Sequence, residues 1–296
     1  MVATKRKSLE DVLVDGVNHA LLFIILIVTL YPFYYVLVVS FNNGLDTMTG
    51  GVYFWPREFT FENYATFFND PKWTMSFFVS VLRTVVGTFL GVMFTCMVAY
   101  GLAYKDLLFK KSYFALVIFA MYFSGGLIPY YVVLKSLHLL NSFAVYVIPS
   151  MLNTFFLLIA ISFFREIPGE LEESAKVDGA HELYIFLKII MPVSMPMVAT
   201  MALFLGVGQW NSWLDSAFFV QDDSLRTLTY RMIEIINQSA APKEQQGALY
   251  SGQASNVTSF SLQVTAMVVA TVPVMCVYPF LQKYFVKGIM LGSVKG

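Results

Sequence analysis

The chain has 296 residues, of which 57% are hydrophobic and only 13% are charged. Soluble domains are usually about 45–50% apolar and about 25% charged, so both values favour a chain that is solvated largely by lipid. Its formal net charge is zero, which gives no basic field for nucleic acid and predicts no nucleic-acid partner.

Six apolar stretches are long enough to cross a bilayer, which takes about 20 predominantly apolar residues. They cover approximately residues 17–41, 76–104, 112–134, 142–164, 191–215 and 260–285. Basic residues precede the first stretch, but no small-residue cleavage site follows it, so we interpret it as a retained span and not as a signal peptide. The sequence predicts an all-α, polytopic membrane protein with six transmembrane helices.

The distribution of Lys and Arg predicts the orientation, because cytoplasmic loops retain these residues. More of them fall on the N-terminal side of the membrane, including Lys5, Arg6, Lys7, Lys110 and Lys111. Both termini are therefore expected in the cytoplasm, with an N-terminal segment over residues 1–16 and a tail over 286–296. The transmembrane domain occupies 17–285, and its long external loops, 42–75 and 216–259, are expected to form a surface for docking a partner. The second loop contains a helical candidate, LTYRMIEIINQ, at 228–238.

The cytoplasmic loop over residues 166–190 is predicted to form a helix, a bend and a second helix. Pro168 and Gly169 can start the first helix, and the acidic residues that follow complement the helix dipole. Glu172 and Lys176 have the i,i+4 spacing of a helix-stabilising ion pair. Gly179 can adopt the left-handed conformation that ends a helix, and Asp178 is expected to cap a second helix starting near Ala180. Pro192 and Pro196 follow at the start of span five.

The same loop resembles the coupling motif of bacterial ABC importer permeases. That motif contains Glu-Ala-Ala and Asp-Gly-Ala, followed by Phe, Ile, Leu-Pro and Pro at set spacings. The matching residues here are Glu173-Ser174-Ala175, Asp178-Gly179-Ala180, Phe186, Ile189, Met191-Pro192 and Pro196. Ser for Ala and Met for Leu are mild departures.

Further segments are similar to the carbohydrate-specific, maltose-type branch of this family. They are AYGLAYK (99–105), GLIPYYVVLKSLHLLNS (126–142), QWNSW (209–213) and FVKGIMLGSVKG (285–296). The position of Tyr104 is usually basic in that branch, whereas here the basic residue, Lys105, comes one position later. SGGLIP (124–129) and the C-terminus look closest to permeases for complex oligosaccharides, including those from plant or uronic-acid polysaccharides.

The resemblance implies a type I ABC importer permease fold in the bacterial cytoplasmic membrane. It implies as partners a second homologous permease, two ATPase subunits that hold ATP and Mg, an extracytoplasmic sugar-binding protein, and an oligosaccharide substrate. It also implies that the loop couples to the ATPase as a rigid knob, through Glu172, Glu173, Ser174, Ala175, Asp178, Gly179 and Ala180.

The sequence contains none of the motifs of a catalytic subunit. It has no G-x-x-x-x-G-K-[ST] loop for ATP, no second His after His181-Glu182 and no G-x-S-x-G turn. We therefore expect a non-catalytic subunit without a cofactor or metal of its own. The alternative is an ion-coupled secondary transporter, which usually has ionisable groups within its spans. Arg83 is the residue that stands out, and we interpret it as snorkelling to the outer interface.

Span five carries polar and aromatic residues of the kind that bind sugars, because aromatic rings stack on sugars and planar polar groups bond to their hydroxyls. The candidates are Gln209, Trp210, Asn211, Trp213 and Asp215, with Tyr122, Ser124 and Asn153 as weaker ones on spans three and four. Polar groups are costly in lipid, so these should face a cavity or another helix. Packing between helices remains an open alternative for each. Gly87 and Gly91 form a small-xxx-small pair that predicts close helix packing.

Overall fold

The computed structural model describes residues 9–239 and 256–292 of the chain, and these are mostly helical. Within them the only extended pairing is a single bridge between Asn42 and Phe59. Three predicted regions lie partly outside the described residues: 1–8 of the N-terminal segment, 240–255 of the second external loop, and 293–296 of the tail. The chain divides into two compact units, one of residues 1–69 and 235–269, the other of 70–234 and 270–296.

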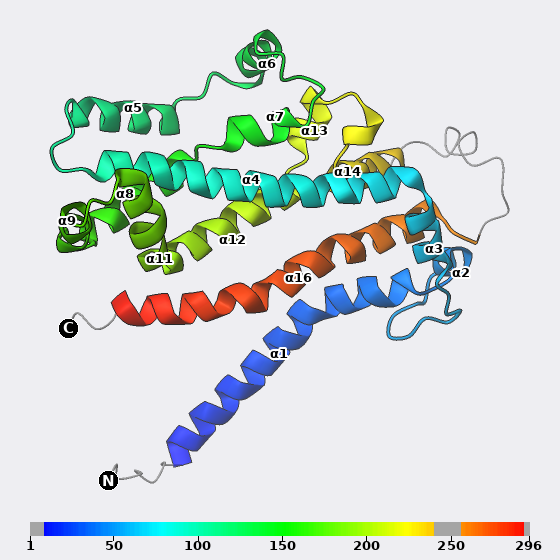
Figure 1. Cartoon of the computed structure of the whole chain (residues 1–296). Helices are drawn as coiled ribbons and strands as arrows, with labels where there is room; N and C mark the ends of the chain where they lie inside the picture. The colour runs from blue at the N-terminus through cyan, green and yellow to red at the C-terminus, as the bar shows by residue number, and fades with distance from the viewer. Residues whose placement is uncertain (1–8, 240–255, 293–296) are drawn as a thin grey trace. The chain divides into compact units, whose positions relative to one another are not determined.

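The first unit contains α1 (Leu9–Ser40), α2 (Gly44–Met48), α3 (Glu62–Asn69) and the beginning of α16 (Ser259–Gly292). Its small core consists of Val38, Val39, Val52 and Val264. The short helices α2 and α3 lie beside the end of α1 (Figure 1). Buried amides hold the chain where α1 ends, since the Asn63 side chain donates to the carbonyls of Ser40 and Asn42 at 2.9 and 2.8 Å. The last turns of α1 therefore belong to a packed structure, unlike the rest of that helix.

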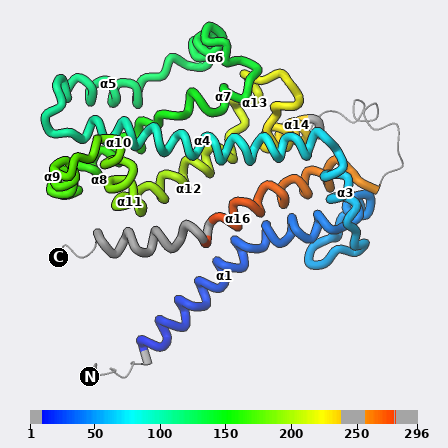
Figure 2. The backbone as a smooth tube through the Cα atoms, viewed as in Figure 1, coloured from blue at the N-terminus to red at the C-terminus, as the bar shows by residue number. Residues whose placement is uncertain are grey.

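The second unit is built on α4 (Pro71–Ala103), which packs against α8 (Thr154–Glu166) and α12 (Met195–Asn211). The Asp70 side chain caps α4 by accepting from the Lys72 N–H at 2.8 Å, and Pro71 fits the first helical turn. Apolar side chains from all three helices meet in one core, among them Cys96, Ala99, Leu157, Ile161 and Met201. Figure 2 shows α9 and α10 at one end of α4 and α13 and α14 at the other.

Three of the predicted spans are interrupted, although the sequence predicted them as continuous. The bend is 116° between α5 (Lys110–Tyr122) and α6 (Leu127–Ser136), and 45° between residues 144–150 and α8. It is 85° between residues 182–193 and α12. Within residues 9–239 and 256–292, three helices, α1, α4 and α16, are long and apolar enough to cross a membrane, and the number rises to six if each bent pair is one span.

Each interruption has a local cause. Gly126 has a φ of +81° directly before α6, a conformation that glycine adopts without strain. Pro149 lies in a short 3-10 turn, η1 (Ile148–Ser150), after α7 (Ala144–Val147), and Asn153 then caps α8. Pro192 and Pro196 flank the break at Ser194, where proline removes a helix hydrogen bond.

The remaining helices are short and connect these segments. They are α9 (Glu170–Val177), α10 (Glu182–Ile185), the π-helical η2 (Phe186–Ile190), α11 (Met191–Val193), α13 (Leu214–Phe219), the 3-10 turn η3 (Asp223–Leu225) and α14 (Leu228–Ser239). The predicted helix at 228–238 is confirmed by α14.

Candidate functional site

The segment between α8 and α10 forms the predicted helix and bend. α9 begins at Glu170, after Pro168 and Gly169, with three glutamates in its first turn. Gly179 has a φ of +80° and its N–H donates to the Lys176 carbonyl at 3.0 Å. The Ala180 N–H donates to the Ala175 carbonyl at 2.9 Å. This pair of bonds is a Schellman motif, which ends a helix on a left-handed residue.

The second helix of this segment starts later than predicted and has a different cap. α10 begins at Glu182, and the His181 Nδ1 accepts from the Tyr184 N–H at 3.2 Å. Asp178 is instead the C-cap residue that follows α9 in the Schellman turn. The prediction that Asp178 caps a helix near Ala180 was wrong. Gly179 and Ala180 still bond back to α9, so the next helix cannot begin until the chain has reversed, at Glu182.

Lys176 links this segment to the end of α4. The sequence predicted a pair with Glu172, but Lys176 forms its salt bridge with Glu182 at 2.8 Å and donates to the Tyr104 hydroxyl. Tyr100 and Tyr104 also donate to the two Glu182 carboxylate oxygens at 3.0 and 3.3 Å. The carboxylate and the tyrosine hydroxyl raise the pKa of Lys176 above its usual value. We call Tyr100, Tyr104, Lys176 and Glu182 the clasp, since they join α9 and α10 to α4.

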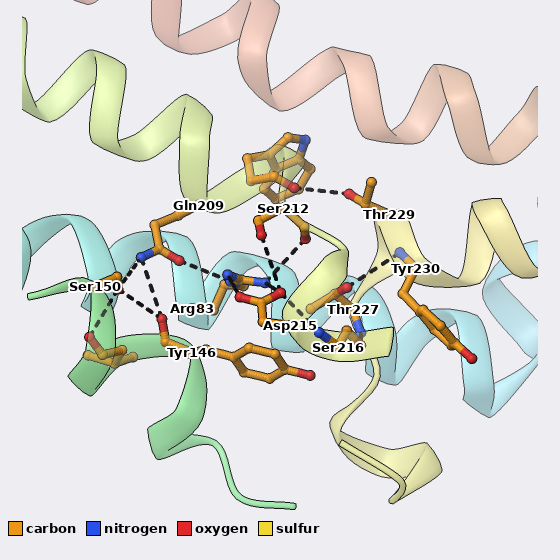
Figure 3. Close-up of polar contacts among 12 residues, drawn as sticks. Arg83, Tyr146, Ser150, Gln209, Ser212, Asp215, Ser216, Thr227, Thr229 and Tyr230 are labelled. Carbon is orange, nitrogen blue, oxygen red and sulfur yellow. Dashed lines mark hydrogen bonds and ion pairs between the residues drawn. The ribbon is translucent and has the colours of Figure 1, made fainter. Parts of the chain in front are cut away.

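A buried polar cluster of the second unit surrounds Arg83 of α4 (Figure 3). Arg83 is 2% exposed, forms an ion pair with Asp215, and donates from Nε to Gln209 Oε1 at 3.0 Å. Its guanidinium carbon lies 4.5 Å from the centre of the Tyr146 ring. The prediction that Arg83 snorkels to the interface was wrong, because α4 turns it inward to a carboxylate 132 residues further along the chain.

Gln209 connects this cluster to η1. Its Nε2 donates to the Ser150 hydroxyl at 2.7 Å, so both ends of the amide are bonded. A Cβ on Gly87 would lie 2.9 Å from the Gln209 amide, and a Cβ on Gly91 would lie 3.6 Å from a Leu205 methyl. The predicted close packing at Gly87 and Gly91 is therefore confirmed, and it makes room for Gln209.

The same cluster stabilises the break after α12. The helix ends at Asn211, and Ser212 is extended with a ψ of 132°. Arg83 Nη1 donates to the Ser212 carbonyl at 3.2 Å, and the Thr229 hydroxyl donates to the Trp210 carbonyl at 3.0 Å. Backbone groups freed by a broken helix need such partners at membrane depth, where water is absent. Charged and hydroxyl side chains here supply them.

The predicted sugar-contact residues lie in different surroundings. Gln209 and Trp210 are buried, and the Trp210 indole N–H donates to the Ala270 carbonyl at 3.0 Å. Asn211 is exposed and Trp213 is partly exposed, on either side of the break. Tyr122 is 76% exposed on α5, and the Asn153 side chain caps α8 by accepting from the Phe156 N–H at 3.1 Å. Sequence reasoning missed Tyr146 and Ser150, which carry no signal of their own in an apolar segment.

These features are those of a helical membrane protein in which broken helices surround a buried polar cluster. No family model matches the chain. The chain is 35% identical to the polygalacturonan/rhamnogalacturonan transport system permease protein YtcP of Bacillus subtilis (strain 168), over 97% of this chain and 100% of that protein. It is 37% identical to protein LplC of the same organism, over 91% and 90%.

A solved structure agrees with these relatives. A bacterial ABC transporter involved in the import of the acidic polysaccharide alginate contains a chain that matches with a TM-score of 0.85 and 26% identity, covering 95% of this chain and 100% of that one. The chain belongs to the family of permease subunits of carbohydrate ABC importers. The first of the two functional interpretations of the sequence is therefore confirmed, in preference to an ion-coupled secondary transporter.

Proposed function

We propose that this permease imports an oligosaccharide derived from a plant or uronic-acid polysaccharide. Two similarities support this substrate class: one to a permease of a polygalacturonan/rhamnogalacturonan transport system, and one to a chain of an alginate importer.

We also propose a topology in which each bent helix pair is one span, which gives six crossings of the bacterial cytoplasmic membrane with both termini in the cytoplasm. Cysteines at Lys110 and Ser174 are then labelled only from the cytoplasm and one at Asn256 only from outside. Labelling of Ser174 from outside contradicts this orientation.

The proposed complex contains a second, homologous permease and two ATPase subunits that hold ATP and Mg. An extracytoplasmic binding protein delivers the sugar to the external loops 42–75 and 216–259. Family membership supports these partners. Residues 166–190 form the contact with the ATPase, through Glu172, Glu173, Ser174, Ala175, Asp178, Gly179 and Ala180.

The observation that carries the coupling role is the attachment of the α9–Gly179–α10 segment to α4 through the clasp. A segment that transmits force must move with the spans, and the clasp ties it to the helix that also carries Arg83. The α9–Gly179–α10 segment also has two exposed apolar side chains, Val177 at 87% and Leu183 at 55%. Apolar side chains displayed next to a polar helix are suited to a groove on a partner.

The test of this coupling role is Gly179→Val in the reconstituted complex. A Cβ on Gly179 meets no atom within 4 Å, so the expected damage comes from the positive φ and not from a clash. Such strain costs on the order of 1–3 kcal/mol. We expect normal membrane insertion but loss of ATPase co-purification or of sugar-stimulated hydrolysis. Gly169→Val, in the same segment with an ordinary helical φ of −62°, is the matched control. Wild-type transport by Gly179→Val rejects the coupling assignment.

Sugar contacts are proposed at the break after α12. Asn211 and Trp213 combine an amide with an indole ring, next to Gln209 and Trp210, whose partners lie within the protein. Tyr122 and Asn153 remain weaker candidates. We expect Asn211→Ala and Trp213→Ala to reduce uptake while leaving complex assembly intact. Unchanged uptake in both variants assigns these residues to helix packing instead.

A further inference from the structure

The exposure of α1 changes abruptly near its end. Large apolar side chains along most of the helix are more than half exposed, such as Phe23 at 61%, Leu30 at 56% and Phe33 at 59%. Val38 is 5% exposed, and Val39 and Ser40 are fully buried. The exposed part of α1 therefore ends after Leu37, which is 41% exposed, about 4.5 Å before the helix end at 1.5 Å per residue.

Aromatic residues from the following loop lie beside the last exposed turns of α1. The Tyr34 hydroxyl donates to the Phe54 carbonyl at 2.6 Å, and the Tyr31 and Phe54 rings are 6.0 Å apart. Tyr53, Phe54 and Trp55 are 59%, 69% and 77% exposed. We call Tyr31, Tyr34, Tyr53, Phe54 and Trp55 the aromatic collar.

A charged layer begins directly after the collar in the sequence. Arg57 forms a salt bridge with Asp46 at 3.0 Å and donates to the Thr49 hydroxyl at 2.7 Å. Asp46 also accepts from the Asn42 amide at 2.9 Å. Apolar α1, the collar and the charged layer thus follow one another, as acyl chains, headgroups and water do across a membrane surface.

We propose that the aromatic collar lies at the boundary between lipid headgroups and acyl chains, and that phospholipid covers it. Tyr and Trp favour this depth because their rings are apolar while the hydroxyl or indole N–H needs a polar partner. The collar is continuous with the exposed surface of α1, a helix apolar enough to span a membrane. The proposal does not depend on the substrate or on the ATPase contact.

This position shifts the membrane register of α1. A span of about 20 residues, counted back from Tyr34, covers residues 15–34, and its other end is marked by Asp15, Asn18 and His19. Residues 35–40, which the sequence placed within a span over 17–41, then stand above the hydrocarbon in the packed first unit. The collar sets how far α1 enters the bilayer.

Trp55 provides the test, with the full chain in vesicles of phosphatidylcholine and phosphatidylglycerol. The Trp55 signal is the difference in fluorescence between the wild type and Trp55→Phe. We expect lipids brominated near the headgroup to quench it at least about twofold more than lipids brominated near the chain end. Trp73, which is 5% exposed and measured through Trp73→Phe, is the buried control.

Three results overturn the proposal. Quenching of Trp55 by aqueous iodide alone places the collar in water, and stronger quenching by the deep bromine places it within the acyl chains. Protection from both probes shows that protein, and not lipid, covers it. Tyr34→Phe removes the bond to Phe54 while leaving the ring, and we expect it to weaken headgroup-level quenching of Trp55. Unchanged quenching in Tyr34→Phe rejects the role of Tyr34 in holding the collar.

Discussion

Replacing Arg83 with methionine tests the buried cluster directly. Methionine fits an apolar interior but removes the ion pair with Asp215 and the donors to Gln209 and the Ser212 carbonyl. The Asp215 carboxylate keeps two partners, the Ser212 hydroxyl at 3.2 Å and the Ser216 N–H at 2.9 Å. The Arg83→Met variant thus leaves the Asp215 carboxylate without its counter-ion, although two hydrogen-bond donors still stabilise it. The arginine that is removed has a side chain that is only 3% exposed.

The expected cost follows from this geometry. Removing one partner of a buried pair costs about 3–5 kcal/mol, because the other charge remains buried without its partner. Asp215 is 21% exposed and keeps two donors, so we expect the lower end, about 3 kcal/mol. Asp215→Asn should cost a similar amount, since it leaves the guanidinium unpaired. The double variant should recover about 1.5 kcal/mol or more, the coupling expected of residues in contact.

The assay is denaturant unfolding of the purified full chain in detergent, arranged as a double-mutant cycle. Arg226→Met is the matched control, since Arg226 donates to the Ser216 carbonyl at 2.7 Å and has no ion pair among the described residues. The Arg226→Met variant should lose less, about 1.5–2 kcal/mol, because it removes one charge-assisted hydrogen bond and the contact with the Tyr230 ring but no ion pair. If Arg83→Met unfolds within about 1 kcal/mol of the wild type, the cluster does not stabilise the break as argued.

Three further predictions concern other contacts. Gly87→Ala should lower the unfolding midpoint by displacing the Gln209 amide, whereas Gly101→Ala, which meets no atom within 4 Å, should not; equal midpoints contradict the packing argument. Tyr104→Phe should reduce sugar-stimulated ATP hydrolysis less than Gly179→Val, because exposed contacts contribute at most about 1 kcal/mol, and a larger loss contradicts this ranking. The Asn42 amide, then Arg57, lowers the pKa of Asp46 below its usual 3.8. A depressed pKa stabilises the fold above that usual value and the stabilisation is lost as pH falls through the folded pKa. The wild type and Asp46→Asn should therefore converge in unfolding midpoint as the pH falls below about 4, and a constant difference refutes the role of this carboxylate.

The apolar stretches and the turn at Gly179 could be read from the sequence because each depends on nearby residues. Hydrophobic length predicts a helix that crosses lipid, and α1, α4 and α16 contain nearly all of the predicted stretches, although α1 begins eight residues earlier, at Leu9. Gly179 takes a positive φ because a helix followed by a reversal requires one there. Glycine and proline also mark the three broken helices, but their effect on direction depends on what the two halves pack against.

The partners of the charged residues depended on the tertiary structure. Lys176 has an acid four residues before it and another six residues after it, and the turn at Gly179 brings the later one, Glu182, within reach. Local spacing favoured Glu172, because the sequence does not show how far the chain reverses.

The sequence by itself determined a helical, lipid-embedded chain with a bent segment between two apolar stretches, because hydrophobic length and turn chemistry act over a few residues. The permease class followed from the resemblance of that bent segment to the coupling motif of ABC importers. Only the tertiary structure decided that Arg83 turns inward, since its carboxylate lies on α13 and its amide partner on α12. The guanidinium of an arginine in an apolar helix can reach a lipid headgroup at the membrane surface or pair with an acidic side chain inside the protein. Which of the two it does depends on which helices pack together. Here α4 packs on α12, and the buried acid satisfies both the charge and the broken backbone.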